Sequence, residues 1–259
     1  MRAPAFTAKL AVEYEDLFYS AQIKPSARPG VDASVARIVK HRGRYENVEL
    51  QTNVPWYFIA CIHALECSLD FSGHLHNGDP LTARTVQVPV GRPKTGSPPF
   101  TWEASAYDAL VYEGFDCITD WSLARMCYLF EKYNGWGYRL HAIHSPYLWS
   151  MTQHYTRGKY IRDGVFSATA VSKQVGIACV LRRMTELNIV SAFATRPSIL
   201  TPDGIVLYNG RGAAALALQR RLNRTPGILL REDGIAGQRT SDAYKRVYGV
   251  YLTGDPRGV

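Results

Sequence analysis

The chain has 259 residues, of which 46% are hydrophobic and 20% are charged, proportions that are ordinary for folded domains and exclude bulk disorder. Lys and Arg number 30 against 22 Asp and Glu, and the formal charge of +8 draws a protein toward polyanions such as nucleic acid, anionic lipid or bacterial cell wall. Neither an apolar run of about 18 residues nor an apolar signal-peptide core is present, so we expect a soluble protein, made in the cytoplasm and not inserted into a membrane.

Apolar side chains recur at helical spacing through most of the chain. Residues 8–20 place Leu10, Leu17 and Phe18 on one face. Residues 56–66 follow a proline and form the most apolar segment, which predicts a helix central to the core. Further helices are expected over residues 31–50, 104–113, 121–132, 146–154 and 170–187.

Residues 70–101 interrupt the helical pattern with many glycines and prolines. Within them, Thr85-Val86-Gln87-Val88-Pro89-Val90 alternates like a short strand. The segment predicts a small β-hairpin lobe. The fold class expected from the first part of the chain is therefore mainly α, in the α+β sense of helices with one small β excursion.

The last quarter of the chain reads as a separate unit. A proline-stiffened stretch predicts a linker over residues 196–207, which leaves a first domain over 1–195 and a small C-terminal domain over 208–259. In the C-terminal domain, helices are expected over 212–222 and 240–248, on either side of a double-glycine turn. We expect a three-helix arrangement there.

Glu66 ends the most apolar predicted helix. Partial burial at that position would raise the pKa of the carboxyl group and keep its proton available near neutral pH, which is what a general acid needs. The alternative is a Glu66 that only caps its neighbours or pairs with a buried arginine.

Cleavage of a glycosidic bond needs a second group on the opposite face of the sugar. Asp79 is the best-placed candidate, because the turn His76-Asn77-Gly78-Asp79-Pro80 follows soon after Glu66. Thr85 is expected to hold the same water from the adjoining strand. The sequence therefore predicts Glu66, Asp79 and Thr85 as the catalytic set of a glycosidase, with no cofactor and no metal.

These residues resemble known cell-wall enzymes. Glu66, Asp79 and Thr85 resemble the Glu-Asp-Thr arrangement of phage-type lysozymes, with a longer interval between Glu66 and Asp79. Tyr133-Asn134-Gly135-Trp136-Gly137-Tyr138, together with Glu66-Cys67-Ser68, resembles the Tyr-Asn-Gly and Glu-Ser segments of lytic transglycosylases and goose-type lysozymes. The region as a whole resembles the bacterial lysozyme family. The resemblance implies a lysozyme-like helical domain in which Tyr133 orients Glu66, and the glycan contacts are expected from Asn77, Gln87, Tyr133, Asn134 and Tyr138.

The C-terminal domain resembles the peptidoglycan-binding module with its LQxxLN and DGxxGxxT signatures. These signatures are matched by Leu218-Gln219-Arg220-Arg221-Leu222-Asn223 and by Asp233-Gly234-Ile235-Ala236-Gly237-Gln238-Arg239-Thr240. The glycines permit a tight turn between helices, and Asp233 and Thr240 are suited to capping helix ends. We interpret these residues chiefly as scaffold.

Together these patterns predict a muramidase of the endolysin type, a monomer whose partner is bacterial peptidoglycan rather than nucleic acid. Because the wall lies outside the inner membrane, we expect the protein to reach it by release from the cell or by dedicated export. A lytic transglycosylase acting on the same bond is the nearest alternative. A zinc-dependent peptidase or amidase using His74 and His76 with Asp79, and a wall-binding protein without catalysis, are the others.

Overall fold

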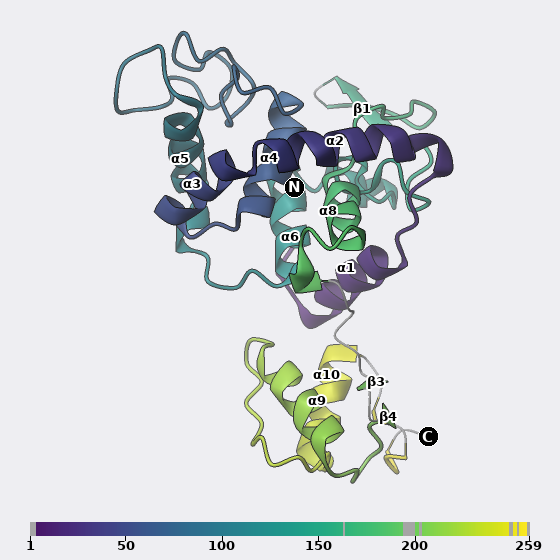
Figure 1. Ribbon diagram of the computed structural model, residues 1–259. Coiled ribbons are helices and arrows are strands. Elements are labelled where there is room, and N and C mark those ends of the chain that lie inside the picture. The colour runs from purple at the N-terminus through teal and green to yellow at the C-terminus, as the bar shows by residue number, and fades with distance from the viewer. Residues whose placement is uncertain are drawn as a thin grey trace. The chain divides into compact units, whose positions relative to one another are not determined.

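The computed structural model describes residues 4–162, 164–193, 200–201, 204–248, 251–252 and 254–257. In these ranges the chain is mainly helical, with ten α-helices and two antiparallel sheets of two strands each (Figure 1). The chain divides into two compact units. One contains Leu17–Ala194, and the other joins Pro4–Asp16 to Thr195–Val259. The first unit therefore differs from the expected domain 1–195, because Pro4–Asp16 belong with the C-terminal part of the chain.

The helices of the first part of the chain largely follow the predicted order, with shifted ends. They are α1 (Ala8–Ser20), α2 (Arg28–Lys40), α3 (Arg42–Thr52), α4 (Trp56–Cys67), α5 (Trp102–Tyr112), α6 (Leu123–Asn134), α7 (Pro146–Trp149) and α8 (Ile177–Glu186). Short 3₁₀ turns occur at Pro25–Ala27, Phe115–Cys117, Gly137–His141 and Ser191–Phe193. The strands β1 (Lys159–Arg162) and β2 (Val165–Ser167) pair antiparallel, with Tyr160 opposite Phe166.

The helix α4 forms the centre of the first unit. Phe58, Ile59 and Cys61 on this helix are fully buried, and α4 packs against α3 and α8. The ring of Phe58 stacks on Phe130 of α6, with ring centroids 4.6 Å apart and planes within 9°. Because the helix is apolar on nearly every face, neighbours on several sides are needed to bury it.

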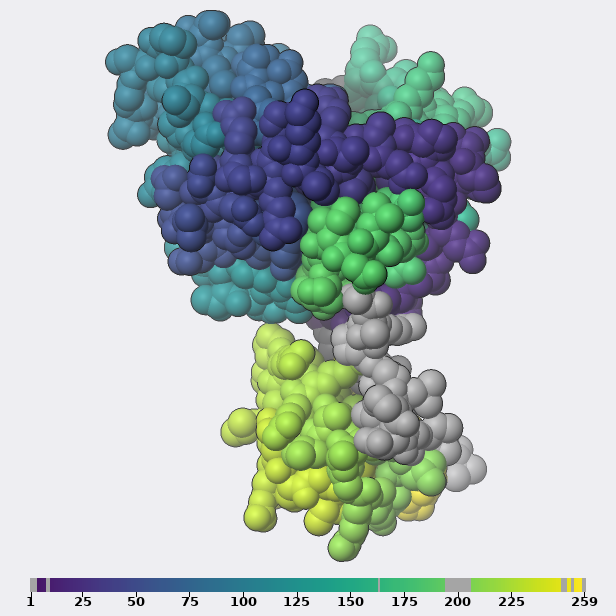
Figure 2. Space-filling view, in the orientation of Figure 1, coloured from purple at the N-terminus to yellow at the C-terminus, as the bar shows by residue number. Residues whose placement is uncertain are grey.

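The predicted helix over 31–50 is two helices. The break occurs at His41, which has φ −110° and ψ 16°. Before the break α2 packs on α8, and after it α3 packs on α4 and α5. Figures 1 and 2 show α2 beside α8 on one face of the unit. The apolar pattern continues through the break because both helices have a buried face.

Residues 70–101 form a long irregular loop, which we call the 70–101 loop. The prediction of a strand over 85–90 is wrong, because no strand occurs in these residues and only Gly73 and Pro80 form an isolated bridge. Val86, Val88 and Val90 alternate as predicted, but all three are exposed. Prolines have no N–H group to donate to a partner strand, and four of them lie between residues 89 and 99.

The second unit contains α9 (Ala213–Asn223), α10 (Gln238–Tyr248) and the short strands β3 (Leu200–Thr201) and β4 (Gly204–Ile205). Its core includes Leu218 and Leu222 of α9 and Val247 of α10. The described residues of 208–259 thus form two helices rather than three. Of the predicted linker, residues 196–199, 202 and 203 lie outside the described residues, while β3 and β4 pair antiparallel within it.

The segment Pro4–Asp16 contributes the third helical piece of the second unit. Val12 packs against the core formed by α9 and α10, and Glu15 Oε2 lies 2.7 Å from Nη2 of Arg221. Both side chains of this ion pair are more than four-fifths buried. Across the described ranges, no helix combines the length and the apolar character that crossing a bilayer requires.

Candidate active site

Glu66 lies in the last turn of α4, where the helix stops abruptly. Ser68 and Leu69 adopt left-handed conformations with φ of 50° and 63°, and the N–H groups of both donate to the carbonyl oxygen of His63. Two consecutive non-glycine residues of this kind are uncommon and are concentrated at functional sites. The sharp end leaves Glu66 half-buried at the edge of the core.

The carboxyl group of Glu66 is surrounded by protein without being paired. Burial raises its pKa to about 7, and the charge of Glu113 adds to the rise. Within the described ranges, no arginine and no hydrogen-bond donor reaches this carboxyl group. The interpretation of Glu66 as the partner of a buried arginine therefore has no support among those residues, and the group is able to hold a proton near neutral pH.

Two residues from other parts of the chain lie near enough to Glu66 for their charges to interact. Tyr133, near the end of α6, donates its hydroxyl to the carbonyl oxygen of Leu75 at 3.2 Å. Burial raises the pKa of Tyr133 well above its ordinary value, and the charges of Glu66 and Glu113 add to the effect. Glu113 follows α5, and burial raises the pKa of its carboxyl group too, with Lys132 opposing the rise. The structure thus brings a second carboxyl group near Glu66 that is not Asp79.

The start of the 70–101 loop is held against the end of α4. Gly78 has φ 78°, and a Cβ atom at this position would lie 2.9 Å from the carbonyl oxygen of Glu66. The thiol of Cys67 donates to the carbonyl oxygen of His74 at 3.2 Å. The turn that carries Asp79 therefore packs directly on the backbone of Glu66.

The carboxylate of Asp79 is buried and organises the 70–101 loop. Its Oδ2 atom accepts from the backbone N–H of Val86 at 2.8 Å, from that of Gln87 at 2.9 Å and from Nδ2 of Asn77 at 3.1 Å. Burial raises the pKa of Asp79, but these hydrogen bonds outweigh it and hold the pKa below its ordinary value. The carboxylate is thus ionised, and its Oδ2 atom is engaged by three donors of the loop.

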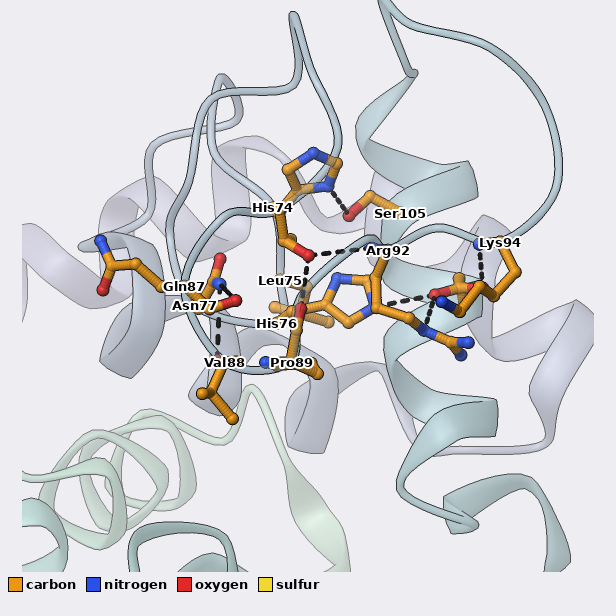
Figure 3. Close-up of polar contacts among 12 residues, drawn as sticks. His74, Leu75, His76, Asn77, Gln87, Val88, Pro89, Arg92, Lys94 and Ser105 are labelled. Carbon is orange, nitrogen blue, oxygen red and sulfur yellow. Dashed lines mark hydrogen bonds and ion pairs between the residues drawn. The ribbon is translucent and has the colours of Figure 1, made fainter.

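Thr85, Asn77 and Gln87 belong to the same loop network. The hydroxyl of Thr85 is buried, donates to the carbonyl oxygen of Pro89 and accepts from the N–H of Arg92 at 2.9 Å. Asn77 also donates to the carbonyl oxygen of Gln87 at 3.1 Å, as Figure 3 shows. Four of the predicted site residues are therefore gathered in one loop. Asn77, Asp79 and Gln87 bond to one another, whereas Thr85 bonds to Pro89 and Arg92 of the same loop.

His74 and His76 have structural partners. Nδ1 of His74 lies 2.8 Å from the hydroxyl of Ser105 (Figure 3), and its Nε2 lies 2.8 Å from the carbonyl oxygen of Ala83. Nε2 of His76 lies 2.8 Å from Oδ1 of Asp108. In the part of the chain that is described, no three His, Cys, Asp or Glu side chains are grouped as metal ligands would be. The two histidines tie the loop to α5 instead.

A pocket of about 310 Å³ opens beside the end of α4. We call it the tyrosine pocket. Its lining consists of Tyr138, Pro146, Tyr147, Lys159, Tyr160, Val171, Ser172, Lys173 and Gln174. Gln174 donates from Nε2 to the carbonyl oxygen of Leu65 at 2.6 Å, and the charge of Glu66 contributes to a raised pKa of Tyr147 that is due mainly to burial. The pocket is therefore tied to the last turn of α4, one residue from Glu66, although Glu66 is not among its lining residues.

Two of the predicted glycan contacts take different positions. Tyr138 lines the tyrosine pocket, with its ring at right angles to that of Tyr160 and its hydroxyl accepting from the N–H of Tyr160 at 3.2 Å. Asn134 ends α6 and donates from Nδ2 to the carbonyl oxygen of Phe130 at 3.1 Å. Asn134 thus stabilises the last turn of its helix.

In the second unit, Gln219 is the centre of the signature residues. Its Nε2 donates to Oδ1 of Asp233 at 2.8 Å and to the carbonyl oxygen of Ile235 at 3.0 Å, and its Oε1 accepts from the N–H of Gly234 at 2.8 Å. Gln219 is buried. These bonds hold the double-glycine turn against α9, which agrees with the interpretation of the signature as scaffold.

Sequence reasoning missed four residues that lie at this site: Glu113, Tyr147, Lys159 and Lys173. None of them belongs to a recognisable motif, and each is far from Glu66 along the chain. The proline that opens α7 predicts a helix start beside Tyr147, but it does not predict that Tyr147 lies near Glu66.

No family model matches the chain, and neither a curated protein nor a solved structure matches it.

Proposed function

We propose that this protein cleaves the glycan strands of bacterial peptidoglycan as a lysozyme-like glycoside hydrolase, with Glu66 as the general acid. The observation that carries the proposal is the half-buried carboxyl group of Glu66, with a pKa of about 7, next to the tyrosine pocket. A carboxylic acid that keeps its proton near neutral pH can protonate a glycosidic oxygen. The aromatic lining offers flat apolar faces for sugar rings.

The second unit supports the same proposal by resemblance to the peptidoglycan-binding module. In this proposal it holds the wall while the first unit cuts it. The positive charge of the chain, +8, favours attraction to an anionic wall. The wall is the proposed partner, and the protein acts on it after release or dedicated export.

Lytic transglycosylation is the second candidate, and the state of Asp79 favours it. That reaction needs the same acid, but a hydroxyl of the sugar itself completes it, so no second carboxylate has to activate water. The three hydrogen bonds on Oδ2 of Asp79 occupy one of the two oxygens that hydrolysis would use to activate water. Glu113 is the other carboxyl group near Glu66.

The test is mass spectrometry of the soluble fragments that wild type and Glu66→Gln release from purified peptidoglycan. Glu66→Gln keeps the size of the side chain and removes the proton, so we expect turnover to fall at least a hundredfold while binding to insoluble wall persists. Fragments with reducing-end muramic acid indicate a hydrolase, and anhydromuramic ends indicate a transglycosylase. Glycan cleavage by Glu66→Gln at the wild-type rate contradicts the assignment.

Two additional arms separate the remaining alternatives. Asp79→Asn is expected to lower the melting temperature, because Asn cannot accept all three hydrogen bonds as a charged group does. We expect this variant to release the same kinds of product as wild type. A chelator is expected to have no effect. Peptide fragments from intact glycan, lost on chelation, would support a zinc peptidase at His74 and His76.

A further inference from the structure

The tyrosine pocket carries two lysines that have no acidic partner. Lys159 is half-buried on β1, and Lys173 is exposed in the segment before α8. No ion pair joins either ammonium group to an acidic side chain in the described ranges, and none of the nine lining residues is acidic. Two cations that share one concave surface without compensation create a local positive potential there.

We propose that the tyrosine pocket binds a carboxylate carried by the glycan, with Lys159 and Lys173 as its cationic partners. The inference rests on the proposed function and specifies its substrate. The preferred strand bears carboxylates on its muramic acid units, either on the peptide stem or, in units without a stem, on the lactyl group, since an attached stem converts the lactyl carboxyl group into an amide. A neutral N-acetylglucosamine polymer is then a poor substrate.

The pocket is held in shape by its aromatic wall. The ring of Tyr138 lies 5.8 Å from that of Tyr147 and 5.2 Å from that of Tyr160, both nearly at right angles. The ring of Phe166 packs against Tyr160, with ring centroids 5.4 Å apart, and stacks on His141 at 3.7 Å. Lys159 is the neighbour of Tyr160 on β1, so this packing fixes the backbone that carries the lysine. A preformed site loses less conformational entropy when it binds.

The position of the pocket links it to the bond that Glu66 would cleave. Gln174, next to Lys173, is tied to the carbonyl oxygen of Leu65, the residue before Glu66. Tyr147, which lines the pocket, is near enough to Glu66 for the charge of Glu66 to raise the pKa of Tyr147. In this proposal, a glycan whose carboxylate binds the lysines extends from the pocket toward Glu66. Near neutral pH a protonated Glu66 does not repel this anion.

The test compares peptidoglycan with the same material after its carboxylates have been converted to neutral amides with carbodiimide and methylamine. For wild type, we expect kcat/KM to fall about tenfold on amidation, the equivalent of one charge-assisted hydrogen bond. The variant Lys159→Gln/Lys173→Gln is expected to cleave both materials at the lower value. Lys40→Gln, an exposed lysine on α2, is the matched control and should discriminate as wild type does.

Two additional arms identify the source of the carboxylate and separate this inference from the proposed function. Strands stripped of peptides by an amidase carry only lactyl carboxylates. Retained discrimination there assigns the lactyl group, and its loss assigns the stem. Binding of soluble wall fragments to Glu66→Gln, with and without the two lysine substitutions, is measured by calorimetry. If the wall fragments bind in a lysine-dependent way but wild type does not cleave them, carboxylate binding by the pocket stands and the glycosidase assignment is rejected. If wild type cleaves the wall and neither amidation nor the lysine substitutions have an effect, only carboxylate binding by the pocket is rejected.

Discussion

The proton on Glu66 is held by two influences from different parts of the chain. Its place at the end of α4 buries it, and Glu113, which follows α5, adds a second negative charge nearby. Burial is the larger effect. Below a pH of about 7 the acid form predominates, so an activity that needs this proton declines as the pH rises through that value.

Glu113→Gln tests the second influence. Removing the charge lowers the pKa of Glu66, because the ionised form of Glu66 no longer faces a like charge. We expect the alkaline limb of the pH profile of kcat/KM to move down by about half a pH unit. Glu46→Gln on α3 is the control, because the side chain of Glu46 is 41% exposed and pairs with Arg42 rather than acting on Glu66. An unmoved limb in Glu113→Gln would mean that burial alone sets the pKa.

His63 is a second buried titratable group, and it affects stability rather than the site. Its Nδ1 lies 2.9 Å from the hydroxyl of Tyr45, and its Nε2 lies 3.0 Å from the carbonyl oxygen of Asp70. Burial lowers its pKa to about 4. The neutral ring therefore joins α3 to the chain that follows α4.

This depressed pKa predicts loss of stability in acid. The stabilisation that the neutral His63 ring gives the folded protein is fully present above the ordinary pKa of about 6.5. It is lost as the pH falls through 4, because the unfolded chain takes up the proton at a higher pH than the folded chain does. The total amounts to about 3 kcal/mol. Urea unfolding at pH 7.0 and pH 4.5 measures it, and the loss between these values should be smaller in His63→Gln than in wild type. Equal losses in the two proteins would assign the acid sensitivity to other groups.

At this scale, the sequence predicted a buried acid at position 66, because an apolar helix ending in Glu is visible as a pattern. It could not predict that the Asp79 carboxylate accepts three hydrogen bonds from donors of its own loop. The distribution of hydrogen-bond donors is decided by how the loop folds back. Lys159 and Lys173 could not be found either, since only the tertiary fold brings them to one pocket.

At the level of elements, periodicity located the helices but not their partners. The apolar spacing over 31–50 predicts one helix, but the chain turns at His41 so that α2 and α3 can pack on different neighbours. The alternation over 85–90 predicts a strand. There the N–H groups of Val86 and Gln87 donate to Asp79 instead of to a second strand, so a local side chain replaces the expected pairing.

The contact between the 70–101 loop and α4 predicts a severe effect of Gly78→Ala. The new Cβ would meet the carbonyl oxygen of Glu66 at 2.9 Å, in a conformation with φ 78°. We expect a loss of about 2 kcal/mol or more in the free energy of unfolding, together with reduced activity, measured by urea unfolding and by wall clearance. Gly43→Ala is the matched control, because a Cβ there meets nothing within 4 Å on α3 and should stabilise by about 0.5–1 kcal/mol.

At the scale of the whole molecule, the second unit is assembled from both ends of the described chain. Its stability should therefore depend on the pair between Glu15 and Arg221, whose atoms are 2.7 Å apart. We expect Glu15→Arg to destabilise this unit by about 2 kcal/mol, because it leaves two cations together in a largely buried place, and the double swap Glu15→Arg/Arg221→Glu to restore much of the loss.

Hydrogen exchange of the amides in α9 and α10 measures this effect. Exchange in α4, within the first unit, serves as the internal reference. Equal protection of α9 and α10 in wild type and Glu15→Arg would show that Pro4–Asp16 is dispensable for the second unit.

The partnership of Glu15 with Arg221 also imposes an order on biosynthesis. The two residues are 206 positions apart, so the segment that contains Glu15 leaves the ribosome long before its partner exists. Contacts of such high sequence separation form late and slowly, whereas residues 17–194 form a unit of consecutive chain that can fold as it emerges. Until α9 has been made, Val12 lacks the core that it packs against. The nascent protein therefore passes through a stage in which the apolar side chains of Pro4–Asp16 are exposed to solvent. A chaperone would act at this stage.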